Sequence, residues 1–319
     1  MVVTISTEHQ KLLDALNEQH LDDFEGLSPY EMHGLLYTPF NEKRSCLRLN
    51  NNIDEKYLSD AYFVRDIKKY LEIINQNQPL KLTAKGNLPR HICRELISVN
   101  ICEQEEKWFE NHPIMKEEDS MYINLINIFT QLNNMVKKKK NKMSLTKKGI
   151  LLMNGDYNEF YTYLFRTYCE KFNWGYSDRY PESWIIQASF PFSIHLLQKY
   201  GNHKRKLNFY VGKMLRAFPN ILNKFKDPFY NSREEYFQRC YGVRVFERFL
   251  FRFGMISISS CEKRTTMFKG DYDIQKKKLI DEFIIWDRKR IQKEDISSII
   301  NKMKVSFLSS KGYIPIDDN

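Results

Sequence analysis

The sequence predicts a mainly α-helical protein with small β-hairpins, an α+β fold of tandem winged-helix-like units. Most of the chain carries apolar residues at helical spacing. Short alternating segments bounded by turn residues stand between these helices. From residue 60 onward the predicted elements follow the order helix, strand, helix, helix, hairpin, helix, which is the order of a winged helix.

Length and composition define the class of protein. The 319 residues are enough for two ordinary domains, and 42% hydrophobic and 14% aromatic residues are enough for large cores. No apolar run approaches the roughly 20 residues of a membrane span, and the N-terminus has no secretory signal. Six cysteines lie far apart without a C-x-x-C pair, which favours a reducing compartment. We therefore expect a cytoplasmic protein without a membrane partner.

The net charge of +10 is unevenly distributed. Residues 1–40 hold seven carboxylates and one lysine, whereas basic residues gather at 137–148, 203–206, 276–278 and 288–290. An acidic face beside a basic face is expected, and the basic face could attract a polyanion. Solubility alone can produce the same asymmetry.

The N-terminal part, residues 1–57, is predicted as an acidic helical lead. Residues 8–24 have helical apolar spacing. Ser28, Pro29 and Glu31 form a capping-box pattern, which predicts a short helix over 29–36 that ends before Pro39.

Residues 58–155 are predicted as the first winged-helix-like domain. Helices are expected at 60–76, from Pro89 to about Val99, and at 121–134, where Asp119 or Ser120 caps the helix. Residues 79–83 are predicted as a strand, and the acidic segment 103–118 as an inserted loop or short helix.

The stretch MVKKKKNKMSLTKKG, residues 135–149, is the most unusual in the chain. It contains seven lysines. Two short extended runs flank a Lys-Asn pair at residues 140–141, which predicts a β-hairpin. Thr146 would then cap the next helix, and residues 144–146 would neighbour the strand at 81–83. The L-T-x-K-G pattern at 82–86 and 145–149 could instead signal an internal duplication. We favour one domain, because each half alone lacks elements needed to bury its apolar face.

Residues 156–270 are predicted as an aromatic-rich helical region that ends in a second winged-helix-like unit. Its predicted elements are helices at 156–174, 184–201 (interrupted near Pro191), 207–225 and 232–253, then strands at 255–260 and 263–270. A helical tail, 271–319, would hold helices at 278–291 and 294–304.

Several blocks together resemble an uncharacterised family of bacterial proteins. They are GLSPYEMHGLLYTPF, PLKLTAKGNLPRHICREL, MVKKKKNKMSLTKKG, FRTYCEKFNW and VFERFLFRFGMIS, and the resemblance covers roughly residues 24–270. The L-T-x-K-G exit from the hairpin more loosely resembles the wing region of MarR-like regulators. The resemblance implies an architecture and no activity or site residues.

The first candidate site is the lysine hairpin. Its lysines could contact phosphates that flank a DNA groove: Lys137, Lys138, Lys139, Lys140 and Lys142. The alternative is a solvated edge, because lysines on exposed strands also block aggregation.

Two further sets of residues are candidates for nucleic-acid contact. Asn124, Asn127 and Gln131 share one face of the helix where a winged helix reads bases, and such amides can read adenine. That helix has no Arg or Lys, so a solvent face or a protein-binding face is the alternative. Arg244, Arg248 and Arg252 recur every four residues and could line a phosphate-binding surface or form ion pairs within the helix.

No pattern argues for catalysis, a metal or a cofactor. Four residues are of types that bind zinc, but their spacing in the sequence matches no usual zinc-binding motif: His91, Cys93, Cys102 and His112. We therefore predict a non-enzymatic nucleic-acid-binding protein with duplex DNA as its partner. The alternative is a protein–protein adaptor that uses the acidic N-terminus or the Asn/Gln stripe. A nuclease built on Asp271, Asp273, Glu282 and Lys289 is a distant third.

Overall fold

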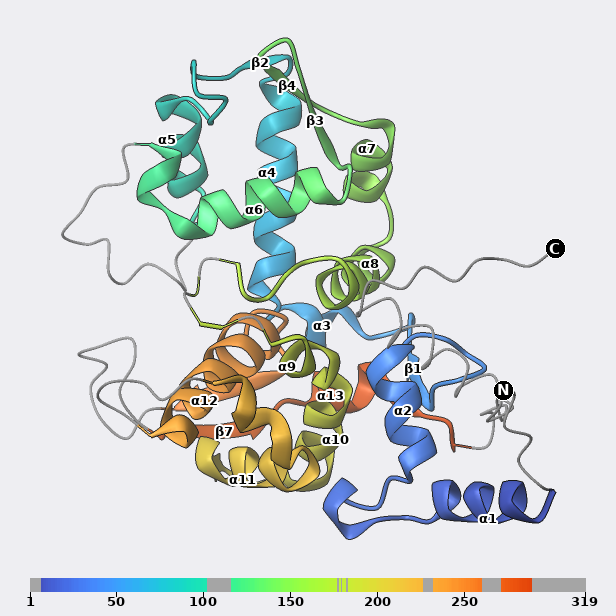
Figure 1. The fold of residues 1–319 in the computed structure, drawn as a ribbon. Helices are drawn as coiled ribbons and strands as arrows, with labels where there is room; N and C mark the ends of the chain where they lie inside the picture. The colour runs from blue at the N-terminus through green and yellow to red at the C-terminus, as the bar shows by residue number, and fades with distance from the viewer. Residues whose placement is uncertain are drawn as a thin grey trace, which may run out of the picture. The chain divides into compact units, whose positions relative to one another are not determined.

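A computed structural model describes residues 7–101, 116–176, 178, 180–181, 183–225, 232–259 and 271–288 (Figure 1). The protein is mainly helical with small antiparallel sheets, as the sequence predicts. The chain forms two compact units, Met1–Arg48 with Trp286–Asn319, and Leu49–Ile285. Among the described helices, none has the length and apolar character needed to cross a membrane.

The first unit contains α1 (Thr7–Glu18), a 3₁₀ turn η1 (Asp22–Phe24) and α2 (Pro29–Tyr37). The predicted capping box is confirmed. Ser28 Oγ accepts from the Glu31 backbone N–H at 3.2 Å, and Glu31 Oε2 accepts from the Ser28 N–H at 2.8 Å. Pro29 occupies the first helical turn, where its missing N–H has no cost.

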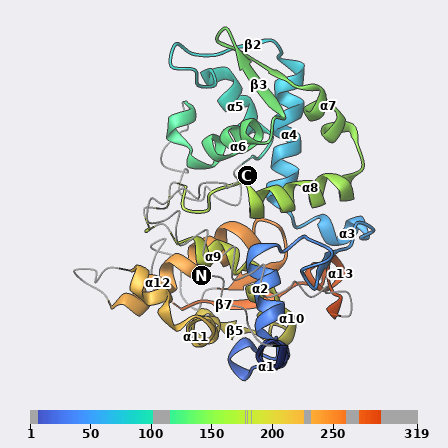
Figure 2. The same cartoon turned by 45° about the vertical axis from the view of Figure 1, so that its right-hand side comes forward.

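The first half of the second unit follows the predicted order of elements. Its elements are α3 (Glu55–Leu58), α4 (Tyr62–Gln76), β2 (Leu80–Lys81), α5 (Arg90–Ser98), the 3₁₀ turn η3 (Glu117–Asp119), α6 (Met121–Leu132), β3 (Val136–Lys139), β4 (Lys142–Leu145) and α7 (Lys147–Asn154). The predicted neighbouring strands do pair, because β2 lies antiparallel to β4. In Figures 1 and 2 the sheet β2-β4-β3 lies beside the C-terminal half of α4.

The two L-T-x-K-G segments have different structures. Gly86 lies in a turn with φ +80°, a conformation that favours glycine. Gly149 lies inside α7, where an added Cβ would come within 2.1 Å of the Met135 carbonyl oxygen. Leu82 directly follows β2 and Leu145 ends β4, and these two strands are neighbours in one three-stranded sheet.

The second half of the unit repeats this order with other sequences. Its elements are α8 (Tyr157–Glu170), α9 (Trp184–Ala188), α10 (Phe190–Tyr200), β5 (Arg205–Lys206), α11 (Leu207–Ala217), the 3₁₀ helix η4 (Pro219–Lys224), α12 (Arg233–Tyr241), the π-helix η5 (Gly242–Leu250), β6 (Ile256–Ser259), β7 (Asp273–Lys276) and α13 (Lys278–Phe283). Its sheet has the order β5-β7-β6, which corresponds strand for strand to β2-β4-β3. A third sheet pairs β1 (Leu47–Leu49) with β8 (Ile284–Trp286).

Two predictions for the C-terminal elements were wrong. The strand that pairs with β6 is β7, further along the chain than the predicted 263–270 segment. The predicted helix 278–291 ends at Phe283, because the β-branched Ile284 and Ile285 enter β8 instead. The segment 263–270, the helix 294–304 and most of the insertion 103–118 lie outside the described residues.

The core of this unit is aromatic, as expected from the aromatic-rich region predicted at 156–270. Tyr161, Phe165 and Tyr168 of α8 are all buried. The Phe165 ring meets that of Phe253 edge-on, with centroids 5.6 Å apart, and Tyr168 stacks on Phe249 at 5.7 Å. These aromatic side chains contribute to packing and are unavailable for stacking on bases.

Candidate nucleic-acid interface

The lysine-rich stretch forms the predicted hairpin. Strands β3 and β4 pair in register, with Val136 opposite Leu145 and Lys139 opposite Lys142. The tip residues Lys140 and Asn141 have φ of 50° and 55°. Two successive left-handed residues make the tight turn whose twist matches paired strands, and asparagine tolerates that conformation.

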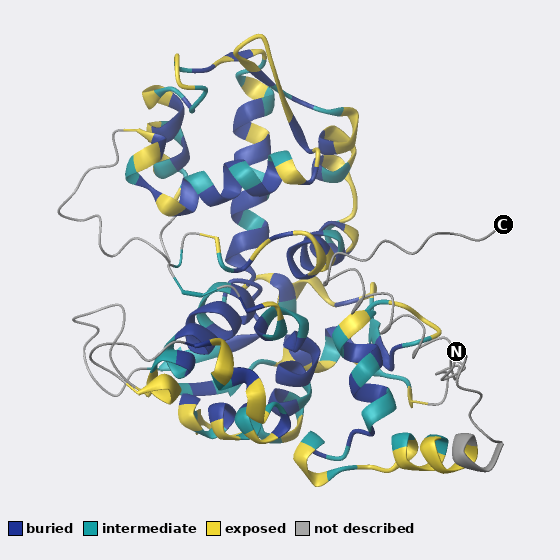
Figure 3. Ribbon diagram, in the orientation of Figure 1, coloured by how far each residue is buried: buried dark blue, intermediate teal, exposed yellow. Residues whose placement is uncertain are grey.

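The pleat separates apolar from cationic side chains. Val136, Met143 and Leu145 are buried on the inner face, together with Leu80 of β2. Side chains alternate between faces along a strand, so Lys137, Lys139 and Lys142 belong to the outer face. All three are exposed, and Figure 3 shows exposed ribbon at this end of the unit beside α4, which is mostly buried.

Lys81 of β2 completes a row of three lysines across the sheet. Lys81 lies opposite Lys142, and Lys142 lies opposite Lys139. Neighbouring strands are about 4.8 Å apart, and like charges directly opposite one another destabilise a sheet. We call Lys81, Lys137, Lys139 and Lys142 the lysine face. In the described part of the chain no carboxylate forms a salt bridge with them.

The other two predicted lysines are placed differently. Lys138 Nζ donates to the Gly86 carbonyl oxygen at 2.9 Å, so its ammonium group lies against the turn after β2. Lys140 lies at the exposed tip. The prediction missed Lys81, although its place in the short strand before the 83–87 turn was visible in the sequence.

The second sheet has the same strand order and different chemistry. The row that corresponds to Lys81, Lys142 and Lys139 consists of Lys206, Asp273 and Ser259. Lys206 Nζ lies 3.3 Å from Asp273 Oδ1, so its charge is balanced within the sheet. The lysine row is therefore a property of the first sheet and does not follow from the topology.

The Asn/Gln stripe serves the interior of the protein. Asn127 is buried; its side-chain NH₂ donates to Glu117 Oε1 at 2.7 Å, and its Oδ1 accepts from Gln131 at 2.7 Å. Asn124 donates to the same Glu117 oxygen at 3.1 Å and accepts from Tyr176. The prediction that this stripe reads bases was wrong for Asn127, and the other two amides already have protein partners.

Glu117 explains why this network exists. Its carboxylate is buried, and it also accepts from the Leu88 backbone N–H at 2.7 Å. A buried charge requires several donors to offset its lost hydration. The side-chain amides of Asn124 and Asn127 on α6 supply two of these donors. Their hydrogen bonds connect the η3 turn to α6.

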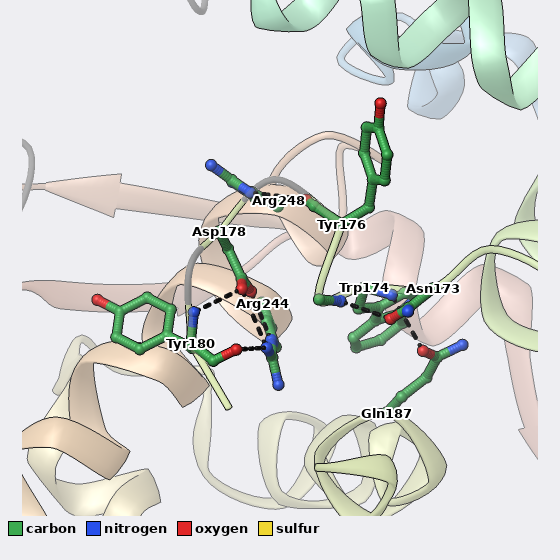
Figure 4. A network of polar contacts seen from close by, with 9 residues as sticks. Asn173, Trp174, Tyr176, Asp178, Tyr180, Gln187, Arg244 and Arg248 are labelled. Atoms are coloured by element: carbon green, nitrogen blue, oxygen red, sulfur yellow. Dashed lines mark hydrogen bonds and ion pairs between the residues drawn. The ribbon is translucent and has the colours of Figure 1, made fainter. Parts of the chain in front are cut away.

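The predicted arginine surface is also internal. Arg244 is buried and forms a bidentate pair with Asp178; its Nη2 also donates to the Tyr180 carbonyl oxygen at 3.3 Å (Figure 4). Arg252 is buried, with its guanidinium 5.4 Å from the centre of the Tyr122 ring. The prediction of phosphate contacts was wrong for both. Arg248 is half-buried and donates to the Tyr176 carbonyl oxygen.

A π-helix explains why Arg244 and Arg248 do not share one exposed face. In η5 hydrogen bonds span five residues, as from the Phe251 N–H to the Phe246 carbonyl oxygen at 2.9 Å. Residues four apart consequently leave the common face that an α-helix would give them. Arg244 instead donates to Asp178, and Arg248 donates to the Tyr176 carbonyl oxygen.

Within the described residues, no three or more His, Cys, Asp or Glu side chains come together as a metal site. His91 and Cys93 lie on α5, exposed and buried respectively, and Cys102 and His112 lie outside the described residues. Asp271 accepts from the Asn208 N–H, and Glu282 pairs with Lys278. Lys289 lies outside the described residues.

Part of the chain matches a known protein family. A family model described as the Y4jL N-terminal domain matches residues 59–158. The matched part runs from α4 through α7 and contains the whole lysine face. No curated protein and no solved structure matches the chain.

Proposed function

We propose that this chain is a non-enzymatic nucleic-acid-binding protein that contacts the phosphate backbone of duplex DNA through the lysine face. The row Lys81–Lys142–Lys139 carries this proposal. Three ammonium groups side by side repel one another in the free protein, and a polyanion lying across them changes repulsion into attraction. Duplex DNA carries one charge per roughly 1.7 Å of its axis, which suits such a surface.

We propose a winged-helix-like scaffold for this role. The order helix, strand, helix, helix, hairpin, helix supports this proposal, in which the lysine hairpin would be the wing. In this proposal α6 corresponds to the recognition helix, but its Asn124 and Asn127 donate to Glu117 and its Gln131 donates to Asn127. We therefore propose binding to the backbone without readout of bases, and hence little dependence on sequence.

The proposed compartment is the cytoplasm. The four cysteines in the described ranges are buried free thiols, Cys46, Cys93, Cys169 and Cys240. Burial raises the pKa of the Cys46 thiol to about 12, because a thiolate would lose its hydration there. Unreactive scattered thiols are typical of proteins in reducing compartments.

The test is binding of labelled duplex DNA, followed by fluorescence anisotropy. The variant Lys81→Gln/Lys139→Gln/Lys142→Gln removes the row, and Lys43→Gln/Lys171→Gln/Lys224→Gln removes the same charge from exposed positions elsewhere. We expect the first variant to lose at least about tenfold in affinity, equally for unrelated duplex sequences, and the second to lose much less. Equal affinities for wild type and the row variant would overturn the proposal.

A further inference from the structure

The N-terminal helix α1 exposes an apolar stripe. Leu12, Leu13 and Leu16 are 59%, 37% and 52% exposed, although their spacing places them along one side of the helix. Exposed leucines at such spacing are the anchors with which an amphipathic helix docks on a partner.

A second apolar patch lies on α7. Ile150 and Leu151 are 40% and 74% exposed, and Lys147 and Lys148 precede them on the same helix. The helix begins directly after β4, where Thr146 Oγ1 accepts from the Gly149 N–H at 3.0 Å. The patch therefore continues the cationic region of the hairpin.

The charges around the two patches are opposite. Residues 11–23 contain four carboxylates and one lysine, whereas residues 136–151 contain seven lysines and no carboxylate. Pairing α1 with α1, or α7 with α7, would bring like charges together. Pairing α1 with α7 buries both apolar patches and brings opposite charges together.

We propose that α1 of one copy docks on α7 of a second copy. The contact joins two different surfaces, so it is heterologous: a pair of copies keeps one unoccupied α1 and one unoccupied α7. Two short helices form a small interface, which places the association in the weak, transient class. The proposal is independent of DNA binding, and its test uses protein freed of nucleic acid.

The experiment measures molar mass by sedimentation velocity from micromolar to several hundred micromolar protein. We expect wild-type mass to rise with concentration and to fall as salt is added, because the attraction is partly electrostatic. Leu16→Glu destroys the α1 stripe and Leu151→Glu destroys the α7 patch, so each variant alone should remain monomeric. Mixed together they should form a one-to-one dimer, because each supplies the surface that the other lacks.

Two controls test whether added charge or loss of folding, rather than loss of the apolar patches, changes the molar mass. Leu132→Glu on α6 adds the same charge at a position that is 46% exposed, and it should associate as wild type does. Circular dichroism of all variants checks that they remain folded. A wild type that is monomeric at every concentration would overturn the proposal. So would a Leu151→Glu variant that still self-associates, or a mixture that stays monomeric.

Discussion

Asn127 has the side chain of a base-reading residue, yet it lies in the interior of the protein. It receives a hydrogen bond from Tyr70 Oη at 3.1 Å and donates to Glu117. The sequence of α6 alone does not distinguish an exposed amide that could bind adenine from a buried amide that donates to a carboxylate. Asn127 is of the second kind because Glu117, in the separate η3 turn, lies next to it.

Replacement of Asn127 by Ala should therefore reduce stability and leave DNA binding unchanged. Loss of this amide leaves the Glu117 carboxylate with one donor fewer, which costs about 1–3 kcal/mol in the free energy of unfolding. Urea denaturation measures that cost, and anisotropy on the folded variant measures binding. Lost affinity for DNA at unchanged stability would restore the base-reading role.

Asp66 gives a second prediction at the scale of one residue. Burial raises the pKa of this carboxyl group, against the hydrogen bond from Tyr122 and the charges of Arg65 and Lys69. Since the folded-state pKa is raised, the folded protein holds the proton more tightly than the unfolded chain. The stability from this group is complete below the unfolded pKa of about 3.9 and is lost as pH rises through the folded value.

Asp66→Asn should consequently remove part of the pH dependence of stability. Asparagine can still accept from Tyr122 and carries no charge at any pH. We expect the urea midpoint of the wild type to fall, relative to that of the variant, as the pH rises from about 4 toward neutrality. Parallel curves for the two proteins would mean that Asp66 titrates normally.

At the scale of the element, the two faces of the β2-β4-β3 sheet have opposite effects on stability. Its inner face packs Leu80, Val136 and Met143 into the core, which stabilises the hairpin. Its outer face places cations opposite one another, which opposes folding. A sheet selected for stability alone would alternate charges, as Lys206 and Asp273 do in the second sheet.

Lys142→Gln should for that reason stabilise the protein while it weakens DNA binding. Removal of the central charge relieves repulsion from both neighbours, and we expect a gain of about 0.2–1 kcal/mol at low salt. The gain should disappear at high salt, because exposed charges are then screened. Thermal unfolding at two salt concentrations measures it, with Lys171→Gln as the control. A loss of stability at low salt would show that the row is not repulsive.

Gly149 tests how α7 is held against the hairpin. An added Cβ would collide with the Met135 carbonyl oxygen, so Gly149→Ala should cost about 1–3 kcal/mol in stability. Gly212→Ala in α11 is the matched control, since no atom lies within 4 Å of its added Cβ. The control should be neutral or stabilising by up to about 1 kcal/mol. Equal thermal midpoints for the two variants would contradict the packing described for α7.

At the scale of the whole molecule, one element order occurs twice with different surface chemistry. In each half of the second unit a helix precedes a strand, two helical segments, a hairpin and a further helix. The β2-β4-β3 sheet carries the lysine face, and the β5-β7-β6 sheet pairs Lys206 with Asp273. DNA is therefore expected to protect β2, β3 and β4 from hydrogen exchange and to leave β5, β6 and β7 unprotected. Equal protection of both sheets would contradict this assignment.

Local sequence patterns predicted most of the helices and strands correctly. They did not predict which polar side chains are exposed. The capping box at Ser28, the hairpin tip at Lys140 and the aromatic stripe of α8 depend on neighbours in the sequence, and all are confirmed. The burial of Asn127, Arg244 and Arg252 depends on distant partners, including Glu117 and Asp178. Lys81 joins the row only through the register of β2 with β4.

The most direct test of the lysine face is the salt dependence of DNA binding. Each phosphate neutralised on duplex DNA contributes a slope of about −0.9 to log K against log salt. The variant Lys81→Gln/Lys139→Gln/Lys142→Gln should therefore show a slope shallower than that of the wild type by about 2.7, three such contacts. The variant Lys43→Gln/Lys171→Gln/Lys224→Gln should keep the wild-type slope. Identical slopes for the wild type and the row variant would show that the lysine face does not contact DNA.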